Sequence, residues 1–133
     1  PGYSGVTLAL MHGVAPAAMV LCHQSGRGTI RRTGRSGAPV PGDPGPGTEV
    51  IIPTLGQLVR EYEETAAWVN PGRVVAVALN TRDLDEHAAR EAVAAATRET
   101  GLAASDPVRF GAGPLAEALI AAHAARRRHA TAS

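Results

Sequence analysis

The stretch RVVAVALN (residues 73–80) is a nearly continuous run of apolar residues that ends in asparagine. Its apolar residues do not alternate with polar ones, which is typical of a strand covered on both faces in a parallel sheet. A second run of this kind, AAMVLCH (residues 17–23), follows Pro16, a residue that breaks regular structure. The two runs therefore predict two buried strands of a mainly parallel sheet.

Residues upstream of each run show helical patterns. Residues 4–13 (SGVTLALMHG) predict a short helix that Ser4 caps and Gly13 ends. A second helix is predicted from Thr54 to the Asn-Pro-Gly at residues 70–72. Its apolar residues recur at helical spacing and are Leu55, Leu58, Val59, Tyr62, Ala66 and Val69.

Two further helices are predicted in the last third of the chain. One begins at Asp83, with Glu86 three residues later as in a capping box, and ends at Gly101. A short extended piece over residues 102–110 follows, and the last helix begins near Pro114. This alternation predicts an α/β fold of three layers, with a mainly parallel sheet flanked by helices.

One domain accounts for residues 1–133, interrupted by a loop rich in Gly, Pro and Arg at about residues 25–53. The centre of this loop, PVPGDPGPGT (residues 39–48), has many prolines without an amide donor and many glycines, so we expect no regular element there. We read the chain, which begins at Pro1, as a piece of a longer protein.

Composition excludes several classes of function. No apolar run is long enough for a membrane span, and a net charge of +1 provides no overall field for nucleic acid. The single cysteine allows no internal disulfide or cysteine-based metal site, so we expect a cytoplasmic protein without a metal. All 13 basic residues are arginines, which excludes lysine chemistry from this chain.

Polar residues follow the predicted strands at three places. The first contains His23 and Arg27, the second contains Asn80 and Thr81 with Arg82, and the third contains Asp106 with Arg109. Because ligands of open parallel sheets bind beyond the carboxyl ends of the strands, we expect the three groups to share one edge and form an anion-binding site.

Each of these residues also has a purely structural interpretation. His23 is a candidate general base, or a strand-end histidine bonded to a carbonyl. Asn80 either contacts a ligand or forms a turn, and Asp106 either joins the site or forms an Asx turn. Two other residues are predicted to have no chemical role: Cys22 as a buried apolar residue, and His12 as a helix-end residue facing solvent.

Four segments in order resemble the C-terminal part of the D-glutamate N-acetyltransferase family, long catalogued as a domain of unknown function with a P-loop NTPase-like fold. They are YSGVTLALMHG (3–13), VLCHQSGR (20–27), VVAVALNT (74–81) and TGLAASDPVRFG (100–111). The resemblance covers nearly the whole chain apart from the insert at about residues 33–50 and the last few residues. It departs from the family in lacking the phosphate loop GxxxxGK[ST], so the chain resembles only the later strands and helices of the domain.

The resemblance implies a bacterial cytoplasmic enzyme of D-amino-acid metabolism that moves an acetyl group from acetyl-CoA to the amino group of D-glutamate. It implies activity for the full-length protein rather than for this piece, with a small acidic substrate, no membrane or nucleic-acid partner, and a homo-oligomer as an option. The resemblance also implies that the residues at the matching positions belong to the site. They are Tyr3, Ser4, Thr7, His23, Arg27, Asn80, Thr81, Asp106 and Arg109.

In this reading His23 removes a proton from the substrate amine, Arg27 and Arg109 hold carboxylates, and Asn80 or backbone amides stabilise an oxyanion. Two other hypotheses stay open at this point. One is a P-loop nucleotide-dependent ligase or kinase-like enzyme, in which Asn80 contacts the base. The other is a non-catalytic module that uses its arginines to bind an anionic partner.

Overall fold

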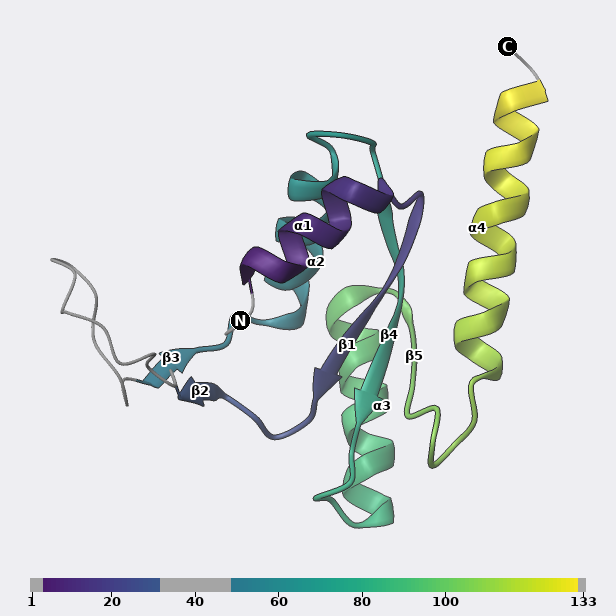
Figure 1. Cartoon of the computed structure of the whole chain (residues 1–133). Helices are drawn as coiled ribbons and strands as arrows, with labels where there is room; N and C mark the ends of the chain where they lie inside the picture. The colour runs from purple at the N-terminus through teal and green to yellow at the C-terminus, as the bar shows by residue number, and fades with distance from the viewer. Residues whose placement is uncertain (1–3, 32–48, 132–133) are drawn as a thin grey trace, which may run out of the picture.

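The computed structural model of the chain describes residues 4–31 and 49–131. Its centre is a parallel sheet of β1 (Ala18–Gln24), β4 (Arg73–Asn80) and β5 (Ala103–Ser105), in the order β1-β4-β5. The two apolar runs are thus neighbouring strands, and Figure 1 shows them side by side. The predicted three-layer α/β fold with a mainly parallel sheet is confirmed.

Helices cover the sheet on both sides (Figure 1). On one side, α2 (Leu55–Ala66) and α3 (Glu86–Thr100) pack against each other and against the sheet, and α1 (Ser4–Val14) packs on α2. On the other side, α4 (Gly113–Thr131) contacts all three strands of this sheet. Since α4 contacts β4 and β5 more extensively than β1, the β1 side of this face is the less covered.

The apolar core lies between the sheet and the α2–α3 layer. Leu21 from β1, Val77 from β4 and Leu58 from α2 are each 5% exposed or less. The complete cluster is Leu21, Leu55, Leu58, Val74, Val77, Leu79, Ala96 and Ala104. Helix α2 begins where predicted, because Thr54 and Gln57 form a capping box in which each side chain bonds the other residue's backbone N–H.

The connections that enter β1 and β4 cross at Gly72. An ideal Cβ built on Gly72 would lie 2.3 Å from the carbonyl oxygen of Pro16, so this crossing requires glycine. The Asn70 side-chain amide donates to the carbonyl oxygens of Ala15 and Pro16, at 2.9 and 3.3 Å. Because the strands start immediately beyond, with Ala18 opposite Arg73, this crossing fixes where the pairing of β1 with β4 begins.

The structure corrects several boundaries. Helix α2 ends at Ala66, before the Asn-Pro-Gly at residues 70–72 that was predicted to end it, and Val69 is exposed. Two short strands, β2 (Thr29–Arg31) and β3 (Glu49–Ile51), form an antiparallel pair inside the stretch expected to lack regular structure. The ends of that stretch are rich in β-branched residues, which favour strands, while residues 32–48 lie outside the described ranges. The predicted extended piece over residues 102–110 contributes only Ala103–Ser105 to the sheet.

The end of α1 and the start of α3 also differ from their predicted positions. Helix α1 includes Gly13 and ends at Val14, so the left-handed residue after it is Ala15, with φ of 49°, instead of Gly13. Helix α3 begins at Glu86 and its cap is Asp85, whose carboxylate accepts from the Ala88 N–H, instead of Asp83. Gly101 ends α3 in the left-handed conformation, as predicted.

Two side chains are placed differently from their predictions. Cys22 is exposed instead of buried, because it points to the face of the sheet that α4 covers incompletely. His12 is partly buried: its Nε2–H donates to the Thr65 carbonyl oxygen at 3.2 Å, and its ring lies 5.7 Å from that of Trp68. His12 thus ties α1 to the end of α2.

Candidate functional site

The three polar groups predicted from the sequence lie at one edge of the sheet. The pairing places Gln24 beside Asn80 and Ala78 beside Ser105, so the carboxyl ends of β1, β4 and β5 are adjacent. An open pocket of about 610 Å³ lies at this edge, and its polar lining is His23, Gln24, Asn80, Arg82, Asp106 and Arg109 together with Cys22. The predicted shared edge is confirmed, while the chemical roles of these residues stay predictions.

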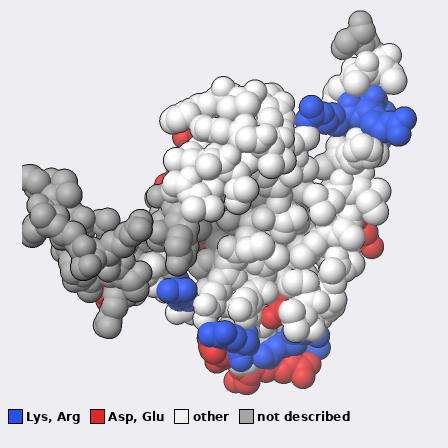
Figure 2. Space-filling view, in the orientation of Figure 1, with Lys and Arg blue, Asp and Glu red and all other residues white. Residues whose placement is uncertain are grey.

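Charged side chains gather at this edge. Figure 2 shows acidic and basic residues clustered at the lower end of the molecule, with a largely uncharged surface above them. A second basic group lies on the last turns of α4, where the sequence carries Arg126, Arg127 and Arg128. On the face that Figure 2 shows, charge is therefore concentrated at the pocket end of the sheet and on the last turns of α4, despite the low net charge of the chain.

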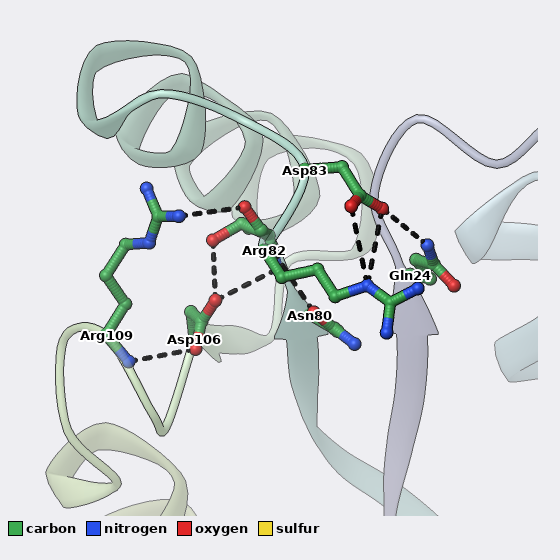
Figure 3. Close-up of polar contacts among 7 residues, drawn as sticks. Gln24, Asn80, Arg82, Asp83, Asp106 and Arg109 are labelled. Atoms are coloured by element: carbon green, nitrogen blue, oxygen red, sulfur yellow. Dashed lines mark hydrogen bonds and ion pairs between the residues drawn. The ribbon is translucent and has the colours of Figure 1, made fainter.

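Asp106 organises the loops on both sides of it (Figure 3). Its Oδ2 accepts from the backbone N–H and the hydroxyl of Thr81, at 2.9 and 2.5 Å. Its Oδ1 accepts from the backbone N–H groups of Val108 and Arg109, both at 3.0 Å. The carboxylate thus forms the Asx-type turn anticipated from the sequence and also joins the end of β4 to the loop after β5.

These four donors leave Asp106 little capacity for a ligand. Asp106 is 4% exposed, and Thr81 beside it is fully buried. The hydroxyl of Thr81 and the three backbone N–H groups stabilise the charged carboxylate, and together they lower the pKa of Asp106 to about 2, against the cost of burial. We therefore interpret Asp106 and Thr81 as residues that hold the site's loops in place.

Replacing Asp106 by asparagine is expected to make the fold less sensitive to acid. The lowered pKa means that Asp106 stabilises the fold above its ordinary pKa of 3.8, and that this contribution disappears as pH falls from 3.8 through about 2. It corresponds to about 2 kcal/mol at neutral pH. The free energy of unfolding, measured with urea, should be lower at pH 2.5 than at pH 7 by about this amount in the wild type. The decrease should be much smaller in Asp106→Asn.

Asp83→Asn provides the matched control for this experiment. Asp83 is exposed, and its carboxylate accepts a single 2.9 Å hydrogen bond from Gln24 beside a weak pairing with Arg82. Its replacement should change the free energy of unfolding by less than about 1 kcal/mol at either pH. Equal acid sensitivity in wild type and Asp106→Asn would contradict the stabilising role of the Asp106 carboxylate.

Arginines supply the positive charge of the pocket. Arg109 donates from Nη2 to the Thr81 carbonyl oxygen at 3.1 Å, which uses one of its five N–H donors. Arg82 makes long contacts to Asp83, at 3.4 to 3.5 Å, and its side chain is 71% exposed (Figure 3). Both guanidinium groups line the pocket and retain donors that suit a carboxylate or phosphate.

Asn80 and Arg27 have more local contacts. The side-chain oxygen of Asn80 accepts a hydrogen bond from the backbone N–H of Arg82 at 3.1 Å. This contact forms a turn, which is one of the two roles that the sequence allowed for Asn80. Arg27 donates to the Thr29 carbonyl oxygen at 3.3 Å and lines a smaller adjacent pocket of about 300 Å³. Arg27 thus lies beside the larger pocket rather than in its lining.

His23 lines both pockets. In β1 it lies on the same face as Leu21, two residues earlier, so its ring extends the core toward α3. Burial lowers the pKa of His23, and the nearby carboxylate of Glu99 opposes this effect in part. A histidine with a lowered pKa is neutral at pH 7 and can accept a proton.

The remaining predicted site residues are Tyr3, Ser4 and Thr7. Tyr3 lies outside the described residues, and the side chain of Ser4 is likewise not described. Thr7 lies on α1, which packs on α2, and neither pocket at the strand ends has it in its lining. Sequence reasoning also missed Glu99, although its spacing from Ala92 and Ala96 places it on the inner face of α3.

The chain matches the family DUF1611_C, described as a domain of unknown function and a P-loop domain, over residues 1–116. The chain belongs to the DUF1611 C-terminal family. A crystal structure of a DUF1611 family protein from Anabaena variabilis is 38% identical, with a TM-score of 0.69. It aligns with 86% of this chain and 30% of its own length.

A relative named D-glutamate N-acetyltransferase, from Tritonibacter scottomollicae, is 35% identical over 120 residues. The alignment covers 90% of this chain and 32% of the relative, so the chain spans about a third of the length of both proteins. These matches confirm the resemblance to the C-terminal part of the acetyltransferase family. They relate the chain to an acetyltransferase at the level of the family.

The residues of this DUF1611 domain do not fit the phosphate loop that the family description implies. Such a loop needs a lysine and clustered glycines in the order GxxxxGK[ST], and the 133 residues contain no lysine. Nor, among residues 4–31 and 49–131, do three His, Cys, Asp or Glu side chains come together as a metal site would require. None of the helices in the same ranges has the length and apolar character of a membrane crossing.

Proposed function

We propose that the DUF1611 domain described here forms the acceptor side of an N-acetyltransferase that uses acetyl-CoA as donor and D-glutamate as acceptor. The observation that carries this proposal is a single pocket whose lining includes His23 and two arginines, Arg82 and Arg109. The name of the 35% identical relative supports the choice of substrates.

The pocket's charge suits an acidic amino acid. Glutamate carries two carboxylates, and arginine binds a carboxylate through paired N–H donors. Arg109 is held in place at two points, because its backbone N–H donates to Asp106 and its side chain donates to the Thr81 carbonyl. We assign one substrate carboxylate to Arg109 and the other to Arg82.

Acetyl transfer requires a neutral amine. In the proposed reaction the amine nitrogen attacks the thioester carbonyl carbon, His23 accepts the proton that the nitrogen loses, and the carbon–sulfur bond breaks as the carbonyl re-forms. The departing thiolate then takes a proton, which the His23 imidazolium supplies. His23 is suited to this role because burial lowers its pKa and keeps it neutral near pH 7.

The test uses the natural polypeptide that contains these residues. Purified protein should release free CoA thiol from acetyl-CoA when D-glutamate is added, and should produce N-acetyl-D-glutamate by mass spectrometry. L-Glutamate and D-glutamine, which change the chirality or one charge, serve as comparison substrates. Absence of both thiol release and acetylated product with D-glutamate would refute the proposal.

Replacing Arg109 by alanine is expected to raise the KM for D-glutamate about ten- to a hundredfold, which is the effect of losing a hydrogen bond to a charged group. The KM for acetyl-CoA should change little. Arg98→Ala is the control, because Arg98 is an exposed arginine of α3 outside both pockets. An unchanged KM for D-glutamate in Arg109→Ala would contradict the assignment of a carboxylate to this residue.

A further inference from the structure

A carboxylate shares a pocket with His23. The smaller pocket, of about 300 Å³, has His23 and Arg27 on one side and the first turn of α2 on another. Helix α3 forms a further wall with Ala92, Ala96 and Glu99. Since His23 also lines the larger pocket, it is shared between the proposed acceptor site and the pocket that contains Glu99.

The folding of α3 explains why Glu99 lies there. Ala92 and Ala96 pack against the sheet, and Glu99 follows Ala96 by three residues, which places it on the same face of the helix. Its Oε1 accepts the backbone N–H of Gly56, the second residue of α2, at 2.9 Å. The partial positive charge of a helix N-terminus favours a charged carboxylate at this position.

Other charged groups line the two pockets that contain His23. Arg27 comes from the loop after β1, Arg82 follows β4, and Arg109 follows β5. The guanidinium groups of these arginines bond the Thr29 carbonyl, Asp83 and the Thr81 carbonyl, whereas Glu99 is the charged group that acts on the pKa of His23. The carboxylate of Asp106 lines the larger pocket too, but four donors within the loops already bind it. Cys22, the neighbour of His23 in β1, lies on the opposite face of the strand.

We propose that Glu99 is a positioning residue for His23, whose carboxylate stabilises the imidazolium formed when His23 accepts the substrate's proton. The proposal rests on the proposed function, in which His23 is the base. Its geometric support is the shared pocket and the fixed position of Glu99 at the start of α2. The direction in which Glu99 acts on the pKa of His23, upward against burial, agrees with it.

The experiment measures His23 directly. The imidazole of His23 is titrated by NMR in the wild type and in Glu99→Gln, which retains a side-chain oxygen for the Gly56 N–H. Loss of the charge should move the His23 titration to lower pH. The acid limb of the kcat/KM profile should move in the same direction by the same amount, because the neutral imidazole then persists to lower pH.

Two further variants separate this effect from a structural one. Glu91→Gln removes the same charge from an exposed position of α3 outside the pocket, and should leave the His23 titration unchanged. Glu99→Asp retains the charge and should give a titration between those of wild type and Glu99→Gln. Added salt should reduce the difference between wild type and Glu99→Gln, because Glu99 is exposed.

The outcomes distinguish this proposal from the proposed function. An identical His23 titration in wild type and Glu99→Gln would overturn the role of Glu99, whether or not the protein transfers acetyl groups. A shifted titration in a protein that never acetylates D-glutamate would support the Glu99–His23 pair and refute the proposed substrates.

Discussion

Replacing Gly72 by alanine is expected to lower the free energy of unfolding by about 3 kcal/mol, the upper end of the usual cost of overpacking. The added Cβ would lie 2.3 Å from the carbonyl oxygen of Pro16, and both groups belong to the backbone. Neither can move by rotation of a side chain, so the two connections would have to separate. Asn70 would then lose its hydrogen bonds to the carbonyl oxygens of Ala15 and Pro16.

Thermal and urea unfolding test this prediction, with a fall in Tm of roughly 10 °C for a domain of this size. Gly13→Ala is the matched control: an ideal Cβ at Gly13, in α1, meets no atom within 4 Å. Because alanine favours a helix over glycine, the control should be neutral or more stable by up to about 1 kcal/mol. Similar stability of the two variants would contradict the proposed close crossing at Gly72.

Replacing His23 by alanine is expected to lower kcat about a hundred- to ten-thousandfold, the usual contribution of a general base. The KM for D-glutamate should change much less, because the arginines are assigned the carboxylates. In the wild type, kcat/KM should fall as pH decreases through the pKa of His23, which burial places below its usual value of 6.5. The alanine variant should lack this dependence.

His87→Ala is the control for this substitution, since His87 is an exposed histidine of α3 outside both pockets. Far-UV circular dichroism and Tm of both variants show whether the fold is retained. Added imidazole should restore part of the activity of His23→Ala, because it supplies a base to the vacated space. A fully active His23→Ala with an unaltered pH profile would exclude His23 as the base.

The sheet and the edge that carries the larger pocket could be predicted from the sequence because they depend on short-range patterns. The runs at residues 17–23 and 73–80 lack polar alternation, which restricts them to buried strands. Parallel pairing then places the residues that follow each strand together, as His23, Asn80 and Asp106 show. Chain order and handedness rules leave few other arrangements.

Other features depend on partners that are distant in the sequence. The exposure of Cys22 depends on how much of the sheet α4 covers, which a run of apolar letters does not reveal. The contact of His12 with Thr65 spans 53 residues, and the hydrogen bond of Glu99 to Gly56 spans 43. Two aspartates, Asp83 and Asp85, precede α3 in the sequence, and the structure shows that Asp85 is its N-cap.

Strand β4 has one more residue than β1 over the span in which the two are paired. The pairing steps from Met19 opposite Val74 to Val20 opposite Ala76, which leaves Val75 unmatched, and is regular from there to Gln24 opposite Asn80. The extra residue at this irregularity is left unpaired, and the residues after it keep their pairing with the neighbouring strand. The alignment of His23 with Leu79 therefore does not depend on the exact number of residues at the amino ends of the two strands.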